Sequence, residues 1–145
     1  MREILFRGKR VDDGKWVYGY CYELEKKPMI SSCVKREAYE VQHKTVEQFT
    51  GLTDKNGRKI FEGDIVKCTD EINGLEFTAL VQFGNPNSEY SWGYQLVFIA
   101  GDEANLDILC WVEMEETGAY IEVIGNIYDN PELLIKGEQL CFFNL

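Results

Sequence analysis

Alternating apolar and polar positions predict antiparallel strands at the start of the chain. Residues 2–8 alternate, and residues 16–22 (WVYGYCY) combine aromatic and β-branched side chains at the spacing typical of a strand. Between them, residues 12–15 (DDGK) have the composition of a turn, so the two segments are predicted to form a hairpin. Residues 29–34 (MISSCV) are a candidate for the next strand.

Aromatic side chains share one face of the strand predicted over residues 16–22, because successive strand residues point to opposite sides. They are Trp16, Tyr18, Tyr20 and Tyr22. Such a stripe either covers a hydrophobic core or stacks against nucleic-acid bases or a sugar. We predict that it covers the core, and we keep Trp16 and Tyr18 as candidate binding residues.

A short helix is predicted to begin near residue 45. Thr45 has the position of an N-cap, and Gln48, three residues later, would complete a capping box. Phe49 and Leu52 would form the apolar face, and Gly51 is a candidate C-cap.

Residues 49–67 (FTGLTDKNGRKIFEGDIVK) contain the strongest turn signals in the chain. Asn56-Gly57 is typical of a two-residue type I′ turn, in which both residues have positive φ. Gly63-Asp64 predicts a second turn, after which Ile65-Val66 begins a strand. An apolar residue, Glu-Gly-Asp and a β-branched pair are typical of the first strand of small SH3-like barrels.

Further strands are predicted over residues 76–83, 92–99 and 120–128. Residues 103–117 fit either a short helix or a buried strand, because the apolar positions satisfy both spacings. The apolar tail, residues 136–145, is predicted to dock on the body of the protein or on another copy, which makes a homo-oligomer one of the hypotheses.

The predicted fold class is therefore α+β, mainly β. The expected organisation has an N-terminal β-hairpin region with a short helix over residues 1–50. This region would pack on a small C-terminal SH3-like β-barrel over residues 51–135. A docked tail over residues 136–145 completes the prediction.

Composition predicts a globular protein of the cytoplasm. Of the 145 residues, 45% are hydrophobic, which is enough for a core. No apolar run approaches the roughly 18 residues that a membrane helix needs, so no membrane partner is expected. The N-terminal sequence MREILFRGKR lacks the apolar segment of about 7–15 residues found in a signal peptide.

Charge divides the chain into unlike halves. Residues 1–68 contain 14 Lys or Arg and 11 Asp or Glu, a net charge of +3. Residues 69–145 contain one Lys and 14 Asp or Glu, a net charge of −13, which together give the −10 of the whole chain. The acidic half is either an ordinary solvated face, a surface for a basic partner, or a contact between copies. It would repel nucleic-acid phosphates.

No catalytic residue, metal site or cofactor is predicted. Five cysteines are widely spaced and the only histidine is His43, whereas zinc sites use clustered Cys and His ligands. The acidic residues Asp102, Glu103, Glu113, Glu115 and Glu116 are candidate metal ligands of a nuclease-like site, with a solvated acidic face as the alternative. The phosphate-binding and hydrolase motifs are absent from the sequence.

Basic residues gather around the predicted central hairpin. Lys55, Arg58, Lys59 and Lys67 are candidate contacts for nucleic acid or for another partner. The alternative is that these cations protect strand edges from pairing with other molecules.

Several sequence blocks resemble the YopX family of bacteriophage and prophage proteins. They are residues 4–7 (ILFR), 48–57 (QFTGLTDKNG), 60–66 (IFEGDIV) and 123–133 (VIGNIYDNPEL). The opening departs from the family pattern, because Gly8-Lys9-Arg10 replaces an aromatic segment. The resemblance implies a small α+β protein with an SH3-like barrel in its C-terminal part, and it implies no catalytic residues.

We therefore expect a non-enzymatic binding or interaction module of phage origin. The first alternative is a nucleic-acid-associated accessory protein that uses the basic N-terminal half. The others are an acidic DNA mimic that binds a basic host protein and an enzyme with an acidic metal site.

Overall fold

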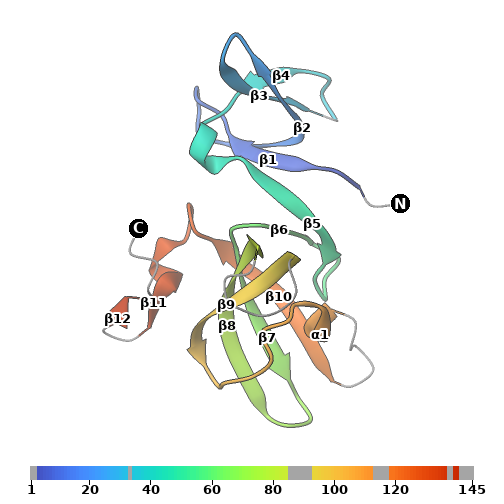
Figure 1. The fold of residues 1–145 in the computed structure, drawn as a ribbon, viewed down its shortest axis with the longest axis vertical. Helices are drawn as coiled ribbons and strands as arrows, with labels where there is room; N and C mark the ends of the chain where they lie inside the picture. The colour runs from blue at the N-terminus through green and yellow to red at the C-terminus, as the bar shows by residue number, and fades with distance from the viewer. Residues whose placement is uncertain (1–2, 33, 85–92, 113–117, 137–138, 141–145) are drawn as a thin grey trace. The chain divides into compact units, whose positions relative to one another are not determined.

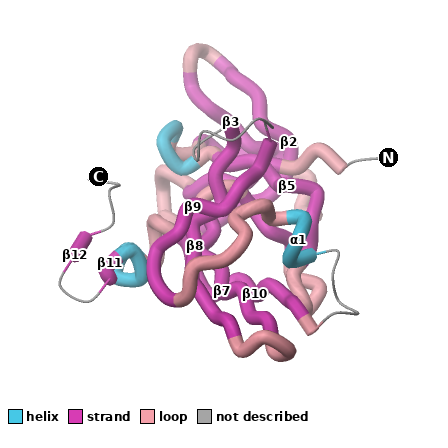
Figure 2. The backbone as a smooth tube through the Cα atoms, turned by 60° about the horizontal axis from the view of Figure 1, so that its bottom comes forward, coloured by secondary structure: helices cyan, strands magenta, loops and turns pink. Residues whose placement is uncertain are grey.

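The computed structural model describes residues 3–32, 34–84, 93–112, 118–136 and 139–140 (Figure 1). The chain forms two compact units, Met1–Gly51 and Leu52–Leu145. Strands dominate both units, as the magenta segments in Figure 2 show. The prediction of a mainly β protein is confirmed.

The N-terminal unit contains the first five strands of a six-stranded sheet with the order β4-β3-β2-β1-β5-β6. Its strands are β1 (Phe6–Lys9), β2 (Trp16–Leu24), β3 (Lys27–Ser32), β4 (Ala38–Glu40) and β5 (Glu47–Thr53). The predicted hairpin at the start of the chain is confirmed, because β1 and β2 pair antiparallel from Phe6↔Gly19 to Lys9↔Trp16.

The predicted helix beginning at Thr45 is wrong. A 3₁₀ turn, η1 (His43–Thr45), ends there, and β5 follows at Glu47. The Thr45 hydroxyl does not cap a helix; it donates to the Gln42 carbonyl at 2.7 Å and accepts the Lys9 N–H at 2.8 Å. Pairing of β5 with β1 supplies hydrogen bonds between distant segments that a local capping pattern does not register.

The core of this unit contains Val17, Ile30 and Val41, with Phe6 and Cys21 packed against them. Val17 and Cys21 of β2 thus occupy the core side of the sheet. The tyrosines at the even positions of β2 lie on the opposite side, where they are exposed. The prediction that this aromatic stripe covers the core is therefore wrong.

The C-terminal unit contains a four-stranded antiparallel sheet with the order β10-β7-β8-β9. Its elements are β6 (Lys59–Phe61), β7 (Asp64–Asp70), β8 (Leu75–Gly84), β9 (Gly93–Gly101), α1 (Leu109–Val112), β10 (Ala119–Asn126), η3 (Pro131–Leu134), β11 (Ile135–Lys136) and β12 (Gln139–Leu140). Strands predicted from residues 65, 76 and 120 are present, and α1 occupies part of the segment that fitted both a helix and a strand.

Two apolar clusters account for the continuous hydrophobic runs in these strands. One contains Phe77, Leu96, Trp111 and Ile121, and the Phe77 and Trp111 rings meet edge to face with centroids 5.2 Å apart. The other contains Ile65, Leu80, Val97, Ile99 and Leu134. Neighbouring β7 residues alternate between the clusters, as Ile65 and Val66 do, so both faces of the sheet are covered.

The described strands of the C-terminal unit make an open sheet, and closure into an SH3-like barrel stays a prediction. Residues 141–145 of the tail that was predicted to dock lie outside the described residues. Within the described part of the chain, no helix has both the length and the apolar character needed to cross a membrane.

The hairpin at Asn56-Gly57 exists, but its predicted type I′ turn is wrong. Gly57 has a φ of +80°, whereas Asn56 is not in the left-handed region. The Gly57 N–H donates to the Asp54 carbonyl at 3.0 Å, and the Asp54 N–H donates to the Arg58 carbonyl at 2.8 Å. This is a three-residue loop in which a β-turn is followed by a left-handed glycine.

Candidate functional site

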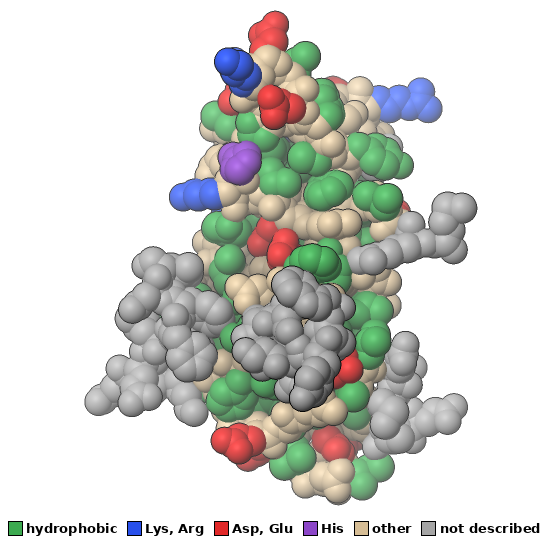
Figure 3. Space-filling model, viewed as in Figure 1, with side chains coloured by type: hydrophobic (Ala, Val, Ile, Leu, Met, Phe, Trp, Pro, Cys, Tyr) green, Lys and Arg blue, Asp and Glu red, His purple; other side chains and the backbone are tan. Residues whose placement is uncertain are grey.

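The tyrosine face is a surface of the N-terminal unit formed by Tyr18, Tyr20, Tyr22 and Leu24 of β2 and by Met29 of β3. The exposed fractions are 44% for Tyr18, 61% for Tyr20, 41% for Tyr22 and 53% for Leu24. Met29 is half-buried and lies directly opposite Tyr22 in the β2–β3 pair. Large side chains with this exposure, gathered on one face of a sheet, are typical of a binding surface. Hydrophobic side chains gather over the N-terminal strands in Figure 3.

Gly19 fixes which residues of β2 face outward. A Cβ at Gly19 would lie 1.8 Å from the Ser31 carbonyl oxygen of β3, so no other residue fits without moving the strands apart. Gly19 points to the same side as Val17 and Cys21, because strand side chains alternate. The close approach of β3 at Gly19 therefore holds β2 in the register that exposes the tyrosines.

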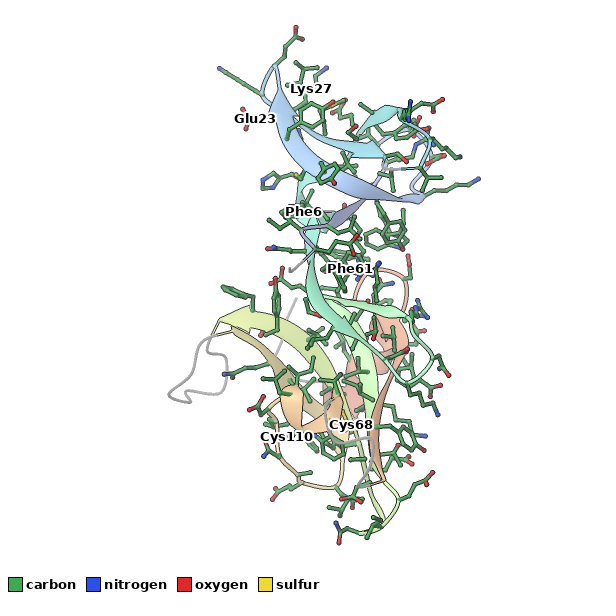
Figure 4. All side chains as sticks on the ribbon, turned by 90° about the vertical axis from the view of Figure 1, so that its right-hand side faces the viewer. Phe6, Glu23, Lys27, Phe61, Cys68 and Cys110 are labelled. Atoms are coloured by element: carbon green, nitrogen blue, oxygen red, sulfur yellow. The ribbon has the colours of Figure 1, made fainter. Side chains whose placement is uncertain are left out.

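Lysines lie at both ends of the tyrosine face. Lys27 is directly opposite Leu24 in the β2–β3 pair and is exposed, beside the β2–β3 turn (Figure 4). Lys9 is directly opposite Trp16 in the β1–β2 pair. Directly opposed residues of an antiparallel pair project to the same side, so both ammonium groups belong to this face.

Two cations of β1 lie near the Trp16 ring, at the end of β2 where the strand begins. The Arg7 guanidinium carbon lies 4.7 Å from the centre of the Trp16 ring, and the Lys9 Nζ lies 5.4 Å from it. Arg7 is buried and pairs with the buried Glu47, with 2.8 Å between Nη2 and Oε1. Glu47 thus neutralises Arg7, and Lys9 is the second cation at this end.

Glu40 is an exposed carboxylate on the same side. It lies opposite Met29 in the β3–β4 pair and is exposed. It stands on β4, the edge strand, away from the line of tyrosines along β2. The line itself is therefore aromatic with positive ends.

The predicted basic residues lie in the C-terminal unit, whereas Trp16 and Tyr18 lie in the N-terminal unit. Lys55, Arg58 and Lys59 come together on the hairpin that joins β5 to β6, and all three are exposed. Lys55 Nζ lies 3.9 Å from Glu122 Oε2 and 4.3 Å from the centre of the Tyr120 ring. Lys67 Nζ on β7 lies 3.2 Å from Glu76 Oε1. Carboxylates thus offset Lys55 and Lys67.

Polar residues of the shared sequence blocks tie the backbone together. Asp54 is buried, and its carboxylate accepts the N–H groups of Asn56 and Arg58 at 2.9 Å and that of Val123 at 3.0 Å. Asp64 accepts the Phe61 N–H at 2.8 Å. Asn126 Oδ1 accepts the N–H groups of Tyr128 and Asp129. These contacts assign the polar residues of the blocks to turns rather than to chemistry.

An open cavity of about 490 Å³ is the second candidate site. Its lining, in the C-terminal unit, comprises Asp70, Ile72, Asn73, Leu75, Ala104, Asn105, Cys110, Trp111 and Ala119. The Asp70 carboxylate accepts hydrogen bonds from Ile72 and from Asn73, and the Trp111 indole N–H donates to the Asn105 carbonyl. Its polar groups are thus engaged within the protein, so the tyrosine face is the stronger candidate.

The cysteines and the acidic residues are weaker candidates for a functional site than the tyrosine face is. Cys68 is buried and Cys110 half-buried in the same core, and burial raises the pKa of the Cys68 thiol (Figure 4). Among the described residues, no group of three or more His, Cys, Asp or Glu side chains is placed to hold a metal ion. Asp102 accepts the Glu76 N–H at 3.0 Å, and the acidic candidates at 113, 115 and 116 lie outside the described residues.

Fold and site define a mainly antiparallel β protein that presents an exposed aromatic face. The chain belongs to the YopX family, since residues 5–135 match the YopX protein family. The match includes both the tyrosine face and the hairpin tied by Asp54. No curated protein matches the sequence.

Proposed function

We propose that this protein is a phage- or prophage-derived binding module without catalytic activity, which acts in the cytoplasm of a bacterial host. Its binding surface is the tyrosine face. The observation that carries the proposal is the exposure of Tyr18, Tyr20 and Tyr22 along one strand. Tyrosine offers a large, stiff ring and a hydroxyl, which suits recognition at a wet surface.

The fold supports this assignment, because rigid elements position the surface. The tyrosines lie on β2, which has paired strands on both sides, and Gly19 sets their register. A surface on paired strands keeps its geometry better than one on loops.

Tyrosine nitration followed by mass spectrometry tests the proposal. The purified protein is labelled with tetranitromethane in buffer and in bacterial host extract at the same protein concentration. We expect the extract to reduce nitration of Tyr18, Tyr20 and Tyr22 relative to Tyr120, a half-buried residue of the C-terminal unit. Equal labelling in buffer and in extract would contradict the proposal.

The acidic half supports a second candidate function, as a DNA mimic that binds a basic host protein. Its described part carries exposed carboxylates on several connections and strand ends: Glu71, Glu76, Asp102, Glu103 and Asp107. The immobilised protein should then retain basic host proteins that duplex DNA releases in competition. Retention of no DNA-releasable protein would rule this candidate out.

A further inference from the structure

We propose that the tyrosine face binds single-stranded nucleic acid, with bases stacked on Tyr18, Tyr20 and Tyr22 and phosphates near Lys9 and Lys27. This inference rests on the proposed function, because it names the partner of the same surface. The observations that carry it are the spacing of the rings, the charges at the ends of the face and the absence of a carboxylate on the tyrosine line.

The spacing of the rings suits an extended strand of bases. Alternate residues of β2 are about 6.8 Å apart, since a strand rises about 3.4 Å per residue. Bases of a single strand are free to separate and to stack individually on aromatic side chains. Tyr18, Tyr20 and Tyr22 therefore form a row of successive stacking positions along the strand.

The charges of the face complement a polyanion. Lys9 and Lys27 lie at the two ends of the row of tyrosines. Lys9 pairs across the strands with Trp16, and Lys27 pairs with Leu24. Arg7 adds no net charge because Glu47 pairs with it. Glu40 stands to one side on β4, so it favours a path along β2 over one across the sheet.

Single strands fit this face better than a duplex does. In a duplex the bases are stacked on one another, so their faces are closed to tyrosine rings. Duplex binding would need many phosphate contacts, whereas this face offers a cation at each end. The net charge of −10 further opposes a partner held by charge alone.

Fluorescence anisotropy with labelled oligonucleotides tests the inference. The probes are fifteen-nucleotide oligo-dT, oligo-rU and a duplex of the same length, at low salt and with the full chain. We expect binding of the single strands and weaker binding of the duplex, and the ratio of the dT and rU affinities distinguishes DNA from RNA as the preferred ligand. No binding of either single strand would overturn the inference.

Paired variants test the stacking positions. Tyr20→Thr with Tyr22→Thr removes two rings but keeps good strand formers, and should weaken binding by at least about tenfold. Tyr20→Phe with Tyr22→Phe keeps the rings and should stay within about threefold of the wild type. Circular dichroism confirms that both pairs fold. Equal affinities for the Thr pair and the Phe pair would overturn the inference.

A further variant separates this surface from the basic hairpin. Arg58→Ala with Lys59→Ala should leave the affinity within about twofold, because neither residue is part of the tyrosine face. Loss of binding in this variant, with binding retained in the Thr pair, would assign the nucleic acid to the hairpin and overturn the inference.

The oligonucleotide-binding test and the nitration test can fail independently of each other. If host extract protects the tyrosines from nitration but no oligonucleotide binds, the binding-module proposal stands and the nucleic-acid inference falls. If light scattering shows self-association that the Thr pair abolishes, the face is a contact between copies and the inference also falls.

Discussion

Asp54 joins two segments that are far apart in sequence. Its carboxylate accepts the N–H groups of Asn56 and Arg58 within the hairpin and that of Val123 on β10. A hydrogen bond to a charged group typically contributes about 1.5–3 kcal/mol to the free energy of unfolding. Asp54→Asn replaces one carboxylate oxygen with an amide donor and should lower the free energy of unfolding by about 2–3 kcal/mol, measured by urea denaturation.

Asp13→Asn is the matched control for Asp54→Asn. Asp13 also accepts a backbone N–H, that of Lys15 at 2.9 Å, but it is exposed. Its substitution should change stability by less than about 0.5 kcal/mol. Similar losses for the two variants would show that the hydrogen bond to Val123 contributes little.

Asp70 should titrate below its ordinary pKa. The side chain and the N–H of Asn73, with the N–H of Ile72, donate to its carboxylate and lower its pKa from the ordinary value of 3.8. Because the folded pKa lies below the unfolded one, the stabilisation is complete above pH 3.8 and is lost as pH falls through the folded pKa. Asn73→Ala should raise the pKa of Asp70, measured by NMR titration of the side-chain carboxyl carbon. An unchanged Asp70 pKa would show that the Asn73 side chain does not hold the carboxylate in solution.

The turn of the hairpin between β2 and β3 has a strained backbone. Glu25 and Lys26 have φ values of +50° and +67°, and the flanking residues Leu24 and Lys27 pair directly. These are the features of a type I′ turn made without glycine or asparagine. Glu25→Asn with Lys26→Gly should therefore raise the free energy of unfolding by about 1 kcal/mol.

Thermal unfolding of the turn variant checks this expectation. Lys15→Gly is the control, because Lys15 is exposed and lies outside the left-handed region, so glycine should give no gain there. A turn variant no more stable than the wild type would show that other contacts fully offset the strain.

The two hairpins show which turns a sequence can reveal. Asn56-Gly57 located a hairpin correctly but not its turn type, because Asp54 and Gly57 select a three-residue loop. Glu25-Lys26 forms the type I′ turn that Asn56-Gly57 was expected to form, and its composition gives no signal. Strand pairing imposes that turn, since β2 and β3 each have further partners.

The tyrosine stripe shows that the sequence predicts a candidate site only in part. Its period of two correctly placed Trp16, Tyr18, Tyr20 and Tyr22 on one face. The period does not show which face packs on the core, and the prediction that this face covers the core was wrong. The core face could have been identified from the alternate residues Val17, Gly19 and Cys21, because a glycine between apolar positions indicates close packing. Tyr20 and Tyr22 were not among the predicted candidate binding residues, and the same register places them on the exposed face.

At the scale of the whole molecule, the acidic residues and the aromatic face lie in different parts of the chain. Residues 69–145 carry a net charge of −13, yet the aromatic face lies in the N-terminal unit. The basic half, residues 1–68, contains the whole N-terminal unit and therefore the tyrosine face. The binding role expected of Lys55, Arg58, Lys59 and Lys67 stays a prediction, and Glu122 and Glu76 offset two of these charges, those of Lys55 and Lys67.

This division of charge makes a prediction about salt. Each phosphate contact on a single strand contributes a slope of about −0.7 to log K against log salt, so Lys9 and Lys27 together give about −1.4. Repulsion from the net charge of −10 weakens as salt screens it, which flattens the slope further. Anisotropy titrations between about 20 and 200 mM salt should therefore give a slope between about −1.4 and zero.

Lys27→Ala should make that slope shallower by about 0.7, whereas Lys59→Ala should leave it unchanged. A slope steeper than about −2.8 would require four or more phosphate contacts, which the tyrosine face does not offer. Binding would then be carried by a larger basic surface that includes Lys55, Arg58 and Lys59. A shallow slope combined with strong dependence on Tyr20 and Tyr22 is instead what stacking on an acidic protein requires, because the affinity then comes from the rings and not from the phosphates.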